Sequence, residues 1–181
     1  MFSFFKNRAS LRKAADAQYK ALLDQARHEA LYTDYAVSDD VTGRFEMIAL
    51  HTSLFMVAVS EKTDCDEKWI RKLPQKIFDV VFKDLDRALR ELGIGDLSVP
   101  KKMKKFMQSF NGRITTYGDI VKRGDEDAMK QAVFRNIYAE SDAVSDEVVA
   151  KMARYIIRLY TAHEALSCTE VAGGKVGEVK P

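Results

Sequence analysis

The sequence contains few residues that break regular structure. Its 181 residues include only three prolines and nine glycines. Short strands joined by tight turns need many such residues, whereas long helices need few. We therefore expect an all-α protein and exclude an all-β sandwich. With 46% hydrophobic and 31% charged residues, a chain of this length can bury about 70% of its extended surface, which excludes disorder.

No hydrophobic run is long enough for a membrane-spanning helix. The longest uncharged run, residues 47–60, has 14 residues, fewer than the roughly 18 that such a helix needs. The N-terminus places three phenylalanines before its first basic residue, the reverse of the order in a secretory signal. We therefore expect no transmembrane anchor, no export signal and a cytoplasmic location.

Cysteine is scarce, and the familiar motifs of catalysis are absent. Cys65 and Cys168 are the only two cysteines, and neither belongs to a Cys-x-x-Cys pair. A domain of this size needs no disulfide, so we expect two reduced thiols. The sequence has no His-Glu-x-x-His pair, phosphate-binding loop or nucleophile elbow. We predict that the protein is not an enzyme and binds no metal or cofactor.

Hydrophobic periodicity predicts a single domain of about six helices. Apolar residues three and four positions apart mark amphipathic helices over residues 10–36, from 64–66 to about 92, from 99 to about 117, over 124–139 and from 141 to about 168. The segment 43–60 is apolar nearly all round and is predicted to be the buried central helix. The domain is expected to cover residues 1–170, followed by a flexible, glycine-rich tail over 171–181.

Two residues inside the predicted helices are unusual for their positions. His51 lies within the apolar segment, where a hydrogen-bonded core histidine is a commoner arrangement than a haem or metal ligand. Gly112 interrupts the helix that starts at residue 99, at a cost of about 1 kcal/mol relative to alanine. Gly112 therefore predicts either a close approach of another backbone or a bend in the helix at this position.

Positive charge is concentrated locally, although 29 basic and 27 acidic residues leave a net charge of only +2. Residues 98–113 contain no acid. Their basic residues, our candidates for binding a client or a membrane, are Lys101, Lys102, Lys104, Lys105 and Arg113. Such a cluster attracts phosphate, anionic lipid or an acidic protein surface. A solvated helix face that carries lysines for solubility is an equally common arrangement.

The N-terminus is the second candidate binding segment. Phe2, Phe4 and Phe5 stand beside basic residues with no acid up to residue 13. Aromatic rings next to positive charges suit a short amphipathic anchor that inserts into a bilayer surface. A packed or frayed terminus fits the same residues.

Several stretches resemble the ubiquinol-cytochrome c chaperone family. They begin with Gly-Arg-Phe-Glu-Met-Ile-Ala-Leu-His-Thr-Ser-Leu-Phe at 43–55 and end with Phe-Asn-Gly-Arg-Ile-Thr-Thr-Tyr at 110–117. The most specific block joins Asp-Arg-Ala-Leu-Arg-Glu-Leu-Gly at 86–93 to Gly-Asp-Leu-Ser-Val-Pro-Lys-Lys-Met-Lys at 95–104. The resemblance covers about residues 30–165.

The resemblance implies a helical assembly factor without catalytic residues. Such a protein helps newly made cytochrome b to enter the respiratory ubiquinol-cytochrome c reductase. In mitochondria it works with a small accessory chaperone subunit near the ribosome exit. The short N-terminus makes this chain look like a bacterial member that acts at the cytoplasmic surface of the inner membrane.

Two other functions are compatible with parts of the sequence. A basic helical module could bind nucleic acid through residues 101–105, but the nearly neutral total charge and the lack of a groove-reading motif argue against a specific nucleic-acid partner. A haem-handling protein or an enzyme could use His51. The lysine helix could also serve a membrane-surface adaptor.

Overall fold

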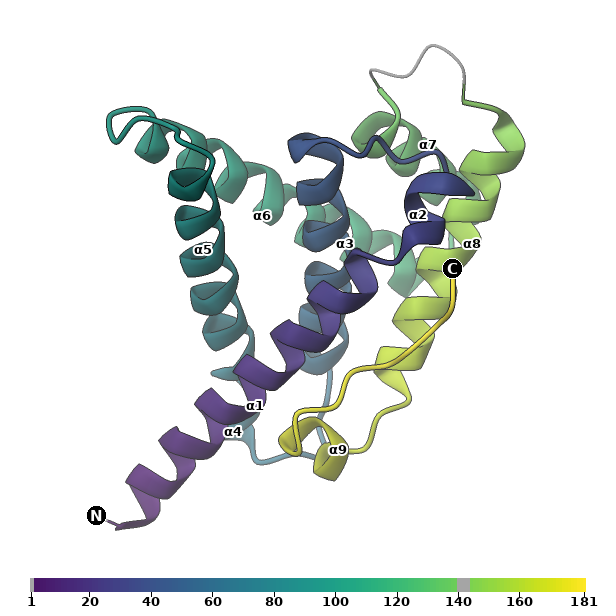
Figure 1. Ribbon diagram of the computed structural model, residues 1–181. Helices are drawn as coiled ribbons and strands as arrows, with labels where there is room; N and C mark the ends of the chain where they lie inside the picture. Colours follow the sequence, from purple (N-terminus) through teal and green to yellow (C-terminus); the bar gives the residue numbers. More distant parts are fainter. Residues whose placement is uncertain (1, 140–143) are drawn as a thin grey trace.

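Nine helices and no strand make up the described part of the chain (Figure 1). The computed structural model describes the backbone of residues 2–139 and 144–181 and the side chains of residues 9–139 and 144–181. The helices are α1 (Phe2–Ala26), α2 (Glu29–Thr33), α3 (Val41–Ser60), α4 (Glu67–Ile70), α5 (Leu73–Glu91), α6 (Val99–Arg123), α7 (Glu126–Ile137), α8 (Asp146–Glu164) and α9 (Cys168–Ala172). Six of them have 12 or more residues, as predicted, while α2, α4 and α9 have at most five.

Helix α3 is the buried centre of the fold. Fifteen of its 20 residues are buried, and it packs against α1, α5, α6 and α8. Its buried hydroxyl groups stay satisfied, because Thr52 and Ser53 donate hydrogen bonds to carbonyl oxygens of the same helix. The predicted central helix is confirmed. In the described chain, no helix combines the length and the apolar character that crossing a membrane would require.

The start of α3 depends on a glycine. The Asp40 carboxylate accepts a hydrogen bond from the Gly43 amide at 2.8 Å and caps the helix. A Cβ atom at Gly43 would lie 1.9 Å from the carbonyl oxygen of Ser38. Any larger residue would therefore push the preceding loop away from the helix.

His51 is a core histidine, as expected. Its Nδ1 lies 2.7 Å from the Met47 carbonyl oxygen and its Nε2 lies 2.8 Å from the Tyr155 hydroxyl. A carbonyl only accepts, so Nδ1 donates to Met47 and Nε2 accepts from Tyr155. Burial lowers the pKa of His51 to about 4, so the ring is neutral at pH 7. Both of its nitrogens have partners, and the hydrogen bond with Tyr155 joins α3 to α8.

Two predicted helices are divided by short turns. The helix expected over 10–36 begins at Phe2 and ends at Ala26, and α2 follows after a break at His28. The His28 ring accepts a hydrogen bond from the Ala30 amide and caps α2, a role that the periodicity of apolar residues does not reveal. The next predicted amphipathic helix is divided into α4 and α5, with Pro74 in the first turn of α5.

Helix α6 passes through Gly112 without interruption, and the close approach predicted there is absent. A Cβ atom at Gly112 would meet no atom within 4 Å. The close approach occurs at Gly118, where a Cβ would lie 3.1 Å from Cγ2 of Val57. Gly118 is therefore the glycine of α6 at which the helix backbone comes close to a side chain of α3.

The C-terminal segment packs against the helices and differs from the flexible tail predicted over 171–181. Val171 and Val176 are 0% and 7% exposed. The Gln18 side chain donates a hydrogen bond to the Val171 carbonyl at 2.9 Å, and the Gly177 amide donates to Nδ1 of His163 at 2.9 Å. Figure 1 shows the segment returning along α8 from α9. Its glycines permit this close packing.

The two cysteines form a disulfide, so the prediction of reduced thiols is wrong for this structure. Cys65 follows α3 and Cys168 is the first residue of α9, and their Cα atoms lie 5.4 Å apart. Their separation of 103 residues in sequence hides this proximity. The bond ties the loop after α3 to the packed C-terminal segment.

Candidate functional site

The basic segment predicted from the sequence forms the first turns of α6, and its lysines point to solvent. Lys101, Lys102, Lys104 and Lys105 are all exposed, whereas the intervening Met103 is half-buried. On the inner side, the ring of Phe106 stacks on Phe45 of α3 with centroids 4.2 Å apart. This aromatic contact fixes the rotation of α6 and directs the lysines outward.

Large apolar side chains lie beside these lysines on the surface. Leu92 at the end of α5 is 61% exposed, Leu97 in the connector is 97% exposed and Met107 of α6 is 40% exposed. We call the surface formed by these residues and the lysines the corner surface. Its members are Leu92, Leu97, Lys101, Lys102, Lys104, Lys105 and Met107. Neither Leu92 nor Leu97 was given a role at the surface from the sequence, although a leucine in a polar connector was a visible signal.

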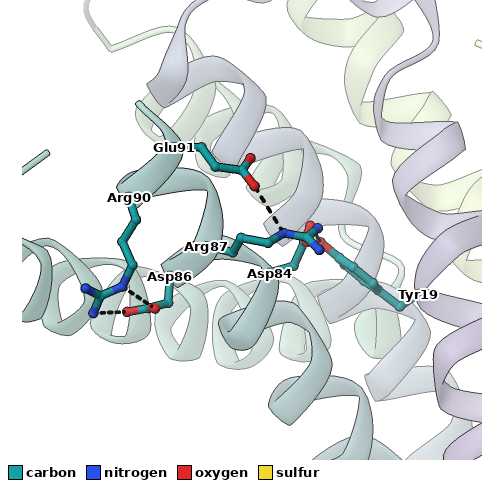
Figure 2. Close-up of polar contacts among 6 residues, drawn as sticks. All are labelled: Tyr19, Asp84, Asp86, Arg87, Arg90 and Glu91. Carbon is teal, nitrogen blue, oxygen red and sulfur yellow. Dashed lines mark hydrogen bonds and ion pairs between the residues drawn. The ribbon is translucent and has the colours of Figure 1, made fainter. Parts of the chain in front are cut away.

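The connector that presents Leu97 is held by an arginine of α5. Arg90 donates from Nε to Asp86 at 2.8 Å and from Nη1 to Asp96 of the connector at 2.6 Å. Figure 2 shows Asp86 and Arg90 on the same side of α5. Gly93 takes a φ of 75° at the end of α5, which glycine adopts without strain. These contacts fix the turn between the two helices.

In the part of the chain that the structure describes, the four lysines of the corner surface have no acidic partner. Among the described residues, no ion pair includes any of its four lysines. The stretch 98–113 also contributes no acid. The surface therefore combines free cationic groups with exposed leucines.

Arg113 does not belong to this surface, in contrast to the prediction. Its guanidinium points into the fold and binds the carboxylate of Glu46 on α3, and the two side chains are 17% and 9% exposed. Burial raises the pKa of Glu46, while Arg113 acts in the opposite direction. Arg113 therefore joins α6 to α3 and does not face solvent.

The structure does not bring the two predicted basic segments together. Phe2, Phe4 and Phe5 lie in the first turns of α1, and their side chains are outside the described residues. Figure 1 shows the start of α1 and the connection between α5 and α6 at well-separated ends of the molecule. The phenylalanine segment and the corner surface are thus separate candidates.

Comparisons with known proteins agree with the resemblance seen in the sequence. The chain is similar to the crystal structure of the Cbp3 homolog from Brucella abortus, with a TM-score of 0.83 and 28% identity over 99% of this chain and 96% of that chain. No curated protein sequence shows a significant match. Residues 33–177 match the model of the Ubiquinol-cytochrome C chaperone family, a range that includes most of the packed C-terminal segment. Because this match covers most of its length, the chain belongs to the ubiquinol-cytochrome c chaperone family.

Proposed function

We propose that this chain is a non-enzymatic assembly chaperone that helps newly made cytochrome b to enter the ubiquinol-cytochrome c reductase. Membership of the chaperone family supports the role in assembly. The corner surface supports a place of action at an anionic membrane, on the cytoplasmic side of the inner membrane. A small accessory chaperone subunit, which the resemblance implies, stays a prediction.

The chemistry of the corner surface suits the headgroup region of a bilayer. A lysine near an anionic membrane contributes about 1 kcal/mol of attraction. An exposed leucine such as Leu97, at 97% exposure, gains about 1.5–3 kcal/mol when it is buried in an apolar environment. Four unpaired lysines and two exposed leucines therefore favour reversible attachment without a membrane-spanning helix.

The positive charge of the four lysines favours lipid, and not the client, as their partner. Cytoplasmic loops of membrane proteins carry an excess of lysine and arginine, which the corner surface would repel. The lysines would hold the chaperone beside the membrane at the place where the client inserts. Other faces of the fold would then contact cytochrome b.

Vesicle binding tests the corner surface. The full chain should sediment with vesicles that contain phosphatidylglycerol and not with phosphatidylcholine vesicles, and salt should weaken the binding. Changing all four lysines to glutamate should abolish it. A matched control changes four exposed basic residues outside both candidate segments and should keep most of the binding: Lys68→Glu, Arg123→Glu, Arg135→Glu and Lys180→Glu. Equal binding by both variants would show that the corner surface has no special role.

Capture of the client tests the assembly role. Newly made cytochrome b, labelled by a short pulse, should copurify with the tagged wild-type chain. The variant with four glutamates at positions 101, 102, 104 and 105 should capture less, because it is no longer held at the membrane. If the wild-type chain captured no labelled cytochrome b, the proposed client would be wrong.

A further inference from the structure

A long groove lies between α1 and α5, away from the corner surface. Its volume is about 990 Å³. It is lined by side chains of α1 from Ala9 onward, by Arg27 just after α1, and by side chains of α5 from Lys76 to Arg87. The opposite sides of α1 contact the rest of the fold, because Gln18 binds the C-terminal segment and Leu22 is fully buried. The groove is thus an outer face of the molecule.

The groove carries a net positive charge. Six basic and three acidic residues line it, a net charge of +3. The three acids are each paired with a base: Asp16 with Arg12, Asp79 with Lys76, and Asp84 with Arg87. Within the described chain, Lys20, Arg27 and Lys83 belong to no ion pair. These three are available to an anionic partner.

Aliphatic side chains line part of the groove, and the Tyr19 hydroxyl has a hydrogen-bond partner there. Ala15, Leu23 and Val80 contribute aliphatic surface. The Tyr19 hydroxyl donates a hydrogen bond to Asp84 at 2.7 Å, and Figure 2 shows Arg87 beside the same carboxylate. Burial raises the pKa of Tyr19, so the hydroxyl keeps its proton. The hydrogen bond from Tyr19 and the ion pair with Arg87 weaken the repulsion between Asp84 and an incoming acid.

The spacing of the free cations fits a helix better than a lipid headgroup. Lys20 lies on α1 and Arg27 directly follows the last residue of that helix, seven positions further along the chain. Seven residues of a helix correspond to a rise of about 10.5 Å along the axis. Lys83 stands on the opposite wall, on α5. Two carboxylates seven residues apart on a partner helix would have the same separation as Lys20 and Arg27. Apolar residues between them would meet Leu23 and Val80. A single phosphate group is much smaller than the helical rise between Lys20 and Arg27.

We propose that the groove between α1 and α5 binds an acidic amphipathic helix of a partner protein. Such a helix would pack between α1 and α5 as a third helix, with its acids at Lys20, Arg27 and Lys83. Basic cytoplasmic loops of a membrane-protein client do not match this charge. This inference does not rest on the proposed function, because it concerns a different face and a different partner.

A designed peptide tests the groove. The probe is a labelled helical peptide of roughly 18 residues, about five turns, with glutamates at seven-residue intervals and leucines on the same face. Its binding to the full chain is measured by fluorescence anisotropy at low and high salt. The groove variant carries Lys20→Glu, Arg27→Glu and Lys83→Glu. The matched control has an equal change of charge at the corner surface: Lys101→Glu, Lys104→Glu and Lys105→Glu.

The wild-type chain and the corner control should bind the peptide with similar affinity, and salt should weaken both. The groove variant should bind at least about tenfold more weakly, since three attractions become repulsions. Lys20→Gln, Arg27→Gln and Lys83→Gln together should give an intermediate loss, and circular dichroism checks that each variant is folded. No binding by the wild-type chain, or equal binding by the groove variant, would overturn the proposal. Loss of phosphatidylglycerol vesicle binding only in the groove variant would assign the groove to lipid instead.

Discussion

Arg113 of α6 binds Glu46 of α3 through two hydrogen bonds, from Nε to Oε2 at 2.9 Å and from Nη2 to Oε1 at 2.7 Å. The paired geometry matches the planar guanidinium to the carboxylate. Both side chains are largely removed from water, so each charge depends on the other. The pair joins the central helix to the helix that presents the corner surface.

Removing only Arg113 should therefore destabilise the fold strongly. Arg113→Leu leaves the buried Glu46 carboxylate unpaired, which costs about 3–5 kcal/mol in the free energy of unfolding. The double variant with Glu46→Leu should recover most of this loss, because no buried charge remains. Urea denaturation near pH 7 measures both effects. A loss below about 1 kcal/mol in the single variant would show that the pair is not effectively buried.

Two buried histidines should make the fold sensitive to mild acid. Burial lowers the pKa of His51 to about 4 and that of His163 to about 3, from 6.5 in the unfolded chain. Below about pH 6.5 the unfolded chain therefore binds more protons than the folded one, and the free energy of unfolding falls as the pH falls. Each histidine contributes about 1.4 kcal/mol per pH unit down to its folded pKa.

A variant isolates the contribution of one histidine. In His51→Gln, the amide can still hydrogen bond to Tyr155 but does not titrate. Between pH 6 and pH 5, its free energy of unfolding should fall less steeply than that of the wild type, by about 1.4 kcal/mol per pH unit. Urea denaturation at several pH values provides the slopes. Identical slopes would mean that His51 is not held neutral by the core.

The disulfide should stabilise the attachment of the C-terminal segment. Because Cys65 and Cys168 are 103 residues apart, their bond restricts the unfolded chain, and its loss should cost about 2–5 kcal/mol. Thermal unfolding with and without a reductant measures this cost. The double variant Cys65→Ser, Cys168→Ser is the control, and its melting temperature should not respond to the reductant. Two titratable thiols in the protein purified without reductant would contradict the bond.

Gly177 should be needed for the packing of the C-terminal segment. A Cβ atom there would lie 2.4 Å from the carbonyl carbon of Ala162, a backbone atom that cannot move aside. Gly177→Ala should therefore lower the free energy of unfolding by about 1–3 kcal/mol and speed proteolysis after residue 171. Gly95→Ala, where a Cβ meets nothing within 4 Å, should change stability by less than about 0.5 kcal/mol. Equal effects of the two changes would refute the packed arrangement.

The sequence was most informative where structure depends on neighbours along the chain. An apolar segment over 43–60 identified the central helix, because only a helix buried on all sides lacks a polar face. The break at His28 was missed, because a histidine that caps a helix leaves no mark in the apolar periodicity. Gly173, Gly174 and Gly177 suggested flexibility, since composition does not distinguish a free glycine from one that permits close contact.

Contacts between residues far apart in the chain could not be predicted from the sequence. Nothing local to Arg113 distinguishes it from the exposed lysines nearby, because its partner Glu46 is 67 residues away. The same holds for Cys65 and Cys168. The four lysines could be identified as a candidate site, whereas the exposure of Leu97 depends on how the connector between α5 and α6 turns.

Deletion of the gene in its native host tests the central claim most directly. The reduced-minus-oxidised spectrum of isolated membranes reports b-type haem, and immunoblots report the assembled ubiquinol-cytochrome c reductase. We expect the deletion to lower both, and the wild-type gene to restore them more fully than the gene with four glutamates at positions 101, 102, 104 and 105. Normal levels of cytochrome b and of the assembled reductase in the deletion strain would contradict the account.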